Sequence, residues 1–219
     1  GYGYRAIANA LLGNYQKAYV DLQTIDQLLD KNPQQANQLD LLRILAVANF
    51  NLGDYQTSVT LHLKLLKLQF SLSRKENIER TYYNLASAYL NLGRYDDAYN
   101  AFWEVKKLSE KKLAPILLAY AQLGIGEVLL QQGENELAYE SLIKAEKLFK
   151  GKNLNRPYLS NLIALAKVSQ KTNRELFASQ LLQKAERLAQ RTGLTRDQIV
   201  LYKMLSVSYK KQGNYRKAL

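Results

Sequence analysis

The sequence predicts an all-α protein made of a repeated helix–turn–helix unit, and three observations lead to that prediction. A short motif recurs every 40 residues along the 219-residue chain. On both sides of each motif, apolar residues recur at steps of three and four, the period of an α-helix with one buried face. Glycine and proline stand where such helices would end and begin.

The recurring motif is Gly-x-Tyr-x-x-Ala. Four copies are complete, apart from Ser58 in place of one alanine, and they begin at Gly13, Gly53, Gly93 and Gly213. The copy at Gly133 lacks the tyrosine, and the copy at Asn173 has asparagine in place of glycine. Because asparagine tolerates the left-handed backbone better than other non-glycine residues, the motif predicts a tight turn with positive φ at its first position.

Each turn is flanked by a first helix before it and a second helix after it. In the third unit the apolar stripe of the first helix is Tyr82, Leu85, Ala86 and Tyr89, and that of the second is Tyr95, Ala98, Phe102, Val105 and Leu108. Two helices and two turns within each unit leave roughly 17 residues per helix. Prolines near the starts of first helices and glycines at the ends of second helices fit this division; they are Pro33, Pro115, Pro157, Gly151 and Gly193.

These residues give the chain a resemblance to the tetratricopeptide repeat family, whose units are antiparallel helix pairs stacked into a solenoid. The resemblance implies one right-handed superhelical solenoid of about eleven helices over residues 1–219, with units of 40 residues where the family usually has about 34. Its turns are expected at Gly13, Gly53, Gly93, Gly133, Asn173 and Gly213.

Neither end of the predicted solenoid carries a polar capping helix, which end repeats usually need. We therefore expect a fragment of a longer protein, truncated at both ends. Residues 201–206 and 213–219 resemble the last repeat before the signalling helix of bacterial multidomain sensors. That resemblance implies the regulatory part of a larger bacterial signalling protein, with the compartment left open between cytoplasm and periplasm.

The composition argues against several kinds of chemistry. The chain has no cysteine and one histidine, His62, so thiol nucleophiles and Cys- or His-rich metal sites are not expected. It contains no P-loop, nucleophile elbow or zinc-protease motif. His62 stands where Phe102, Leu142 and Leu182 stand in other units, which predicts a partly buried packing residue. We expect a soluble, non-enzymatic protein without metal, cofactor or membrane insertion.

Positive charge is concentrated in the last third of the chain. Residues 1–150 carry 17 basic and 16 acidic side chains, whereas residues 151–219 carry 14 basic and three acidic ones. The formal net charge of +12 therefore belongs almost entirely to the last two units. A local excess of this kind attracts acidic partners or phosphate backbones.

The resemblance also implies where a partner binds, because in the family the first helices line the concave face that contacts peptides. The positions carried over are Arg43, Phe50, Tyr83, Leu90, Glu127, Lys167, Lys171, Lys203, Lys210 and Lys211, with Val47 on the same stripe. They predict a scaffold or sensor module for protein–protein interaction that binds an acidic or amphipathic peptide or protein. The alternative is a nucleic-acid-binding helical repeat that uses the basic C-terminal third, and the uncapped ends leave self-association open.

Overall fold

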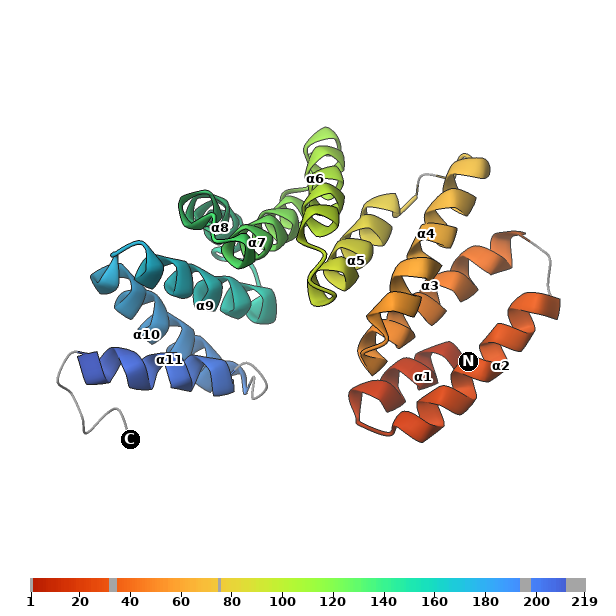
Figure 1. Cartoon of the computed structure of the whole chain (residues 1–219), viewed down its shortest axis with the longest axis horizontal. Coiled ribbons are helices and arrows are strands. Elements are labelled where there is room, and N and C mark those ends of the chain that lie inside the picture. Colours follow the sequence, from red (N-terminus) through yellow and green to blue (C-terminus); the bar gives the residue numbers. More distant parts are fainter. Residues whose placement is uncertain (1, 32–34, 75, 194–197, 212–219) are drawn as a thin grey trace. The chain divides into compact units, whose positions relative to one another are not determined.

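A computed structural model describes residues 2–31, 35–74, 76–193 and 198–211 (Figure 1). These residues form eleven α-helices and no strand, which confirms the all-α class and the expected number of helices. The helices are α1 Tyr2–Leu11, α2 Tyr15–Lys31, α3 Gln35–Leu52, α4 Tyr55–Ser71, α5 Ile78–Asn91, α6 Tyr95–Lys111, α7 Pro115–Gln132, α8 Asn135–Phe149, α9 Asn155–Lys171, α10 Glu175–Thr192 and α11 Gln198–Lys211. Odd-numbered helices are the first helices of their pairs.

The turn inside each described pair has the backbone that the motif predicts. Its glycines have φ between 73° and 86°, and Asn173 has φ 59°. After Gly93, the N–H of Arg94 bonds to the carbonyl of Tyr89 at 2.9 Å; after Asn173, the N–H of Arg174 bonds to the carbonyl of Ser169 at 2.8 Å. This bond closes a left-handed helix terminus, and asparagine closes it as glycine does. Gly213 lies outside the described residues.

The other predicted helix boundaries agree with the structure. Pro115 opens α7, where its missing N–H costs no hydrogen bond, and Pro157 lies in the first turn of α9. Gly193 ends α10 with φ 66°, and Gly151, with φ 74°, follows the end of α8. Pro33 lies outside the described residues. Among the described helices, none is both long enough and apolar enough to cross a bilayer.

The chain divides into two compact units, which we call the N-terminal unit (Gly1–Leu108) and the C-terminal unit (Ser109–Leu219). In the N-terminal unit, α1 packs against α2 and α3, and α3 also packs against α4 and α5. The core under α1 to α4 is built around Ala6, Leu22, Ile25, Leu45 and Ala48. Small residues on first helices allow close approach, so first helices become neighbours of one another as well as of their own partners.

The C-terminal unit repeats this arrangement, with α7 packed against both α8 and α9. Gly126 of α7 faces Leu142 of α8, and a Cβ placed on Gly126 would lie 2.6 Å from the leucine Cγ. Gly126 is therefore a packing residue where α7 and α8 approach closely. Its equivalents in the neighbouring units are the small residues Ala86 and Ala166. Phe149 of α8 is fully buried, and its ring lies nearly perpendicular to the Tyr120 ring with centroids 5.4 Å apart.

Candidate functional site

The predicted partner-binding residues of the N-terminal unit lie half-buried on the first helices α3 and α5. The Phe50 ring contacts Tyr55 edge-on at 5.3 Å between centroids, and the Tyr83 ring contacts Phe102 at 5.6 Å. Arg43 forms an ion pair with Asp40 one turn away on the same helix, and Leu90 is half-buried. Each of these side chains therefore keeps part of its surface exposed while packing fixes the rest.

Between α3 and α5 the structure contains a small cavity of about 40 Å³. Val47 and Phe50 line it from α3, His62 from α4 and Asn84 from α5. Two of these four residues, Val47 and Phe50, belong to the predicted binding stripe. The predicted face thus has a recess with apolar walls and two polar side chains.

His62 is fully buried, at 0% relative exposure, so the packing role predicted for it is confirmed and its burial exceeds the partial burial expected. Its Nδ1 lies 2.9 Å from the Ser58 carbonyl oxygen one turn earlier. Within the described residues its Nε2 has no hydrogen-bond partner. Burial lowers the pKa of His62 to about 4, against a smaller opposite effect of the Ser58 carbonyl, so the imidazole is neutral at pH 7.

Glu127 is the acidic member of the predicted set, and it lies half-buried on α7 between the buried Leu123 and Leu130. Loss of hydration raises the pKa of its carboxyl to about 7. At neutral pH this side chain is therefore divided between the protonated and ionised forms. It can donate a hydrogen bond as well as accept one.

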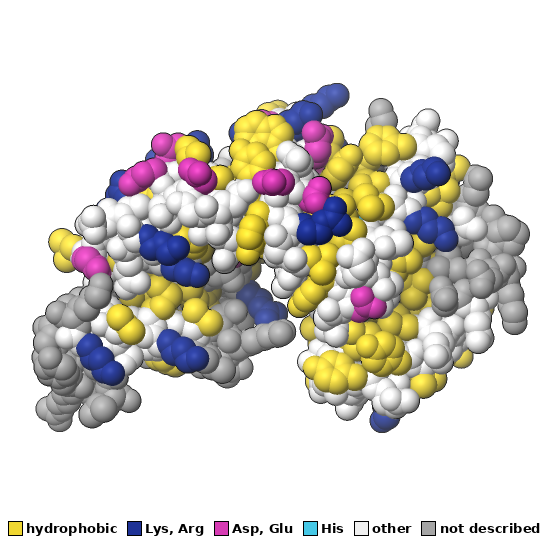
Figure 2. Space-filling view, viewed as in Figure 1, with side chains coloured by type: hydrophobic (Ala, Val, Ile, Leu, Met, Phe, Trp, Pro, Cys, Tyr) yellow, Lys and Arg dark blue, Asp and Glu magenta, His cyan; other side chains and the backbone are white. Residues whose placement is uncertain are grey.

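The predicted lysines of the C-terminal unit point outward. Lys167 and Lys171 are exposed on α9 one turn apart, and Lys203 and Lys210 are exposed on α11 two turns apart. Figure 2 shows Lys and Arg side chains over both helices on the viewed face. Within the described residues none of the four lysines takes part in an ion pair. The side chain of Lys211 lies outside the described residues.

Two other cations of the C-terminal unit are paired across neighbouring repeats. Arg174 reaches Glu136 at 2.9 Å, and Lys184 on α10 reaches Glu146 on α8 at 2.8 Å. These pairs join helices that are 38 residues apart in sequence. Arg174 and Lys184 therefore serve contacts between repeats, whereas the four lysines on α9 and α11 form no such pair in the described part of the chain.

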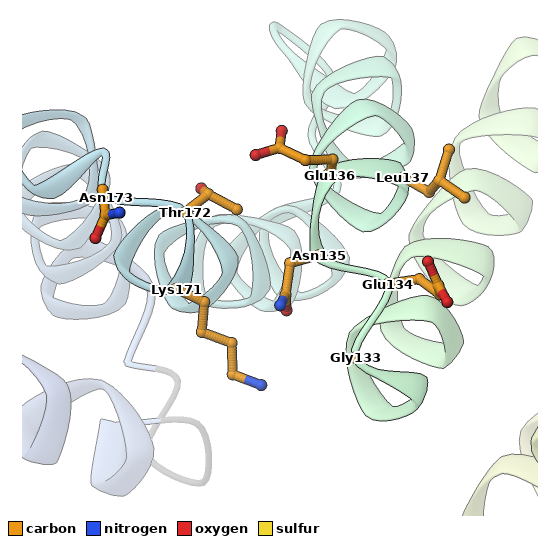
Figure 3. A pocket seen from close by; sticks show the side chains of 8 residues that line it. All are labelled: Gly133, Glu134, Asn135, Glu136, Leu137, Lys171, Thr172 and Asn173. Carbon is orange, nitrogen blue, oxygen red and sulfur yellow. The ribbon is translucent and has the colours of Figure 1, made fainter.

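A second, more open pocket of about 450 Å³ lies between the α7–α8 turn and the α9–α10 turn. Lys171 lines it together with residues 133–137, Thr172 and Asn173. Figure 3 shows the side chains of Lys171 and Asn135 extending to the same side of the two turns, with Glu136 on the other side. The lining mixes one lysine with two glutamates, so it has no single charge preference. Of the predicted site residues, only Lys171 reaches it.

The polar lining of the small cavity was missed by sequence reasoning. The predicted binding stripe includes Val47 and Phe50, whereas His62 is predicted as a packing residue and Asn84 is not among the predicted site residues. The repeat alignment held a signal, since Ser58, His62 and Asn84 are polar where most other units have alanine or apolar residues. His62 and Asn84 line the same cavity because α5 lies beside α3. The repeat alignment alone does not predict this contact between helices.

Comparison with known proteins agrees with the repeat. Residues 79–112, which cover most of α5 and all of α6, match the tetratricopeptide repeat family. A relative from Cyanophora paradoxa, the uncharacterized protein ycf37, is 32% identical over 104 residues, which are 48% of this chain and 59% of the relative. The chain thus spans less than two thirds of that relative.

Solved structures with the same fold cover 99% of this chain. One is a signal transduction ATPase with numerous domains and a tetratricopeptide repeat sensor from Pyrococcus horikoshii, with TM-score 0.79, 17% identity and 34% of that chain covered. Aspartyl phosphate phosphatase F from Bacillus subtilis gives TM-score 0.78, 13% identity and 66% coverage. A Rap protein complexed with competence and sporulation factor gives TM-score 0.75 and 11% identity, with 71% of that chain covered. Identities this low establish the fold alone.

Proposed function

We propose that this chain, a tetratricopeptide-like stack of helix pairs, is a non-catalytic module that binds a peptide or protein segment of acidic or amphipathic character along its first helices. Folds of this type are typical of protein–protein interaction modules. We further propose that the chain is the sensor or regulatory part of a larger signalling protein.

The observation that carries the proposal is the set of exposed lysines on α9 and α11, Lys167, Lys171, Lys203 and Lys210, none of which has a carboxylate partner among the described residues. Unpaired exposed charges of one sign create a local potential that attracts an oppositely charged segment and fixes its register. On the N-terminal unit, the half-buried Phe50, Tyr83 and Leu90 offer apolar contacts instead. Acidic residues of a partner would complement the lysines of the C-terminal unit, and apolar residues would complement the side chains of the N-terminal unit.

The similar structures give this proposal a precedent in their own descriptions. The Rap protein was solved as a complex with a competence and sporulation factor, and the signal transduction ATPase carries a repeat sensor. Both descriptions concern those proteins, and they support the proposal through the shared fold.

Binding by the full chain to three labelled probes tests the class of partner. The probes are an amphipathic peptide with Glu on its polar face, the same peptide with Gln in place of Glu, and random-sequence RNA. We expect the Glu peptide to bind at about 150 mM salt and the Gln peptide to bind much more weakly. RNA binding that exceeds peptide binding at this salt concentration would favour the nucleic-acid alternative and overturn the proposal.

A further inference from the structure

Three polar side chains in the N-terminal unit stand at positions that are mostly apolar or small elsewhere in the chain. Ser58 is equivalent to Ala18, Ala98, Ala138 and Ala178; His62 to Leu22, Phe102, Leu142 and Leu182; and Asn84 to Tyr4, Ile44, Gly124, Ala164 and Met204. The second unit supplies the first two and the third unit supplies Asn84. Their side chains converge on the cavity between α3 and α5, because Ser58 contacts His62 and both His62 and Asn84 line the cavity.

The hydrogen bonds at His62 fix which ring nitrogen carries the proton. The Ser58 carbonyl oxygen, 2.9 Å from Nδ1, can only accept a hydrogen bond, so Nδ1 is the protonated nitrogen. The Ser58 hydroxyl, 3.3 Å from the same nitrogen, donates its own hydrogen to the Ala46 carbonyl at 2.9 Å. Nε2 therefore has a lone pair and acts as an acceptor, and the low pKa of His62 keeps it so at neutral pH.

This acceptor is buried without a partner among the described residues. An unsatisfied buried acceptor destabilises a fold, and leucine, which fills the equivalent position in three other units, would avoid the cost. Asn84, half-buried on the cavity wall, makes no side-chain hydrogen bond within the described part of the chain. The second and third units therefore bring two hydrogen-bonding side chains, His62 and Asn84, to this recess. Most other units have apolar or small residues at the equivalent positions.

We propose that this cavity is a specificity pocket for a short, uncharged side chain that donates a hydrogen bond, a hydroxyl or a carboxamide, with His62 Nε2 as the acceptor. The inference rests on the proposed function, since the side chain belongs to the bound peptide. Val47 and Phe50 pack against its carbon atoms, and Asn84 offers a second hydrogen bond.

The lining residues exclude charged groups. A carboxylate or phosphate would face the lone pair of Nε2, which repels an anion. No carboxylate is among the four lining residues, Val47, Phe50, His62 and Asn84, so an ammonium group would lose its hydration without a counter-charge. With a volume of about 40 Å³ the cavity has room for a terminal hydroxyl or amide and not for a large ring.

The test begins with a displayed library of random peptides selected on the full chain. We expect the recovered peptides to share one position restricted to Ser, Thr, Asn or Gln. In a synthetic copy, Ala at that position should lower the affinity for the wild-type chain about five- to tenfold, the effect of one lost hydrogen bond. The same peptide change should have almost no effect on binding to the His62→Leu variant, which carries the leucine of the equivalent positions and is expected to fold.

A spectroscopic measurement separates a hydrogen bond from a general effect on packing. His62 is the only histidine, so its ring nitrogens give unambiguous signals in a ¹⁵N-labelled chain. The Nε2 signal should shift when the donor peptide binds and stay in place when the Ala peptide binds.

The possible outcomes distinguish the two proposals. Recovery of no peptide would overturn the proposed function, and this inference with it. Peptides that bind without a restricted polar position, or that lose equal affinity on wild type and on His62→Leu, would overturn the pocket and leave the proposed function standing. An unmoved Nε2 signal with the donor peptide would do the same.

Discussion

Two ionisable side chains, His62 and Glu127, occupy helix positions that the repeat normally fills with other residues. Both lose hydration, and in both the neutral form is favoured, so their pKa values move in opposite directions. The histidine is held below its usual pKa and the glutamate above it. Each therefore gives the stability of the fold a different dependence on pH.

For His62, the pKa rises from about 4 in the folded chain to its ordinary 6.5 on unfolding. Between these values the unfolded chain binds more protons, so stability falls as pH falls from 6.5 towards 4. The wild-type chain should lose about 3 kcal/mol more than His62→Leu over this window. Urea unfolding of both proteins from pH 7 to pH 4 measures the difference, and parallel curves would show that His62 is not held neutral.

For Glu127, the folded pKa of about 7 lies above the ordinary value of 4.5. Between these values the folded chain binds more protons, so this residue makes the fold less stable as pH rises from 4.5 through 7. We expect Glu127→Gln to melt at a higher temperature than wild type at pH 8 and at nearly the same temperature at pH 4.5. Glu140→Gln provides the control, because it makes the same chemical change at an exposed position on α8; an equal gain in melting temperature at pH 8 in both variants would contradict the role of burial at Glu127.

The sequence predicts the repeat positions of His62 and Glu127 but not the side chains that surround them. Alignment of the repeats placed His62 among packing positions and Glu127 on the binding stripe. The cavity beside His62 depends on Asn84 being brought next to α3 by a neighbouring helix. The loss of hydration at Glu127 likewise depends on which side chains pack around it, and a period of 40 residues does not specify these contacts.

At the scale of the element, the turns are the best-predicted feature. The replacement of glycine by Asn173 indicated positive φ, and the structure has φ 59° there. The helix before the third turn was predicted less well, since α5 has 14 residues instead of about 17. Left-handed residues Ser73 and Asn77 lie between α4 and α5 and delay the start of the helix, and no glycine or proline marked that segment.

The turn geometry predicts the effect of two substitutions at Gly93, which has φ 73° and open space where a Cβ would lie. With no steric clash, the cost of Gly93→Ala is that of the left-handed backbone, about 1 kcal/mol. Gly93→Asn should cost less, because Asn173 adopts the same conformation in the fifth unit. Chemical denaturation of the three proteins measures this order. Equal losses for Ala and Asn would contradict the account of the turn.

At the scale of the whole molecule, the repeat and the charge follow different patterns. The helix–turn–helix unit recurs along the chain, whereas the excess of basic over acidic residues is confined to residues 151–219. The sequence predicts this asymmetry directly, because the numbers of basic and acidic residues in each part of the chain determine it. It could not predict which cations are paired, since the Arg174–Glu136 and Lys184–Glu146 pairs depend on how successive helix pairs stack.

Self-association and the extent of a single solenoid over residues 1–219 stay predictions. Exposed apolar side chains at the start of the chain, Tyr4, Leu11 and Leu12 among them, are consistent with a surface that another helix covers. Sedimentation of the full chain at several concentrations measures whether a second copy fills that role.

Partner binding is proposed to depend on the lysines of the first helices, and charge reversal tests this dependence most directly. One variant changes Lys167, Lys171, Lys203 and Lys210 to Glu; a matched control changes Lys144, Lys147, Lys152 and Arg187, exposed residues outside the first helices, to Glu. Both have the same net charge, and the readout is the affinity for the labelled Glu peptide at low and at about 150 mM salt. We predict at least a tenfold loss for the first variant and a much smaller loss for the control. Equal affinities in the two variants would contradict the account.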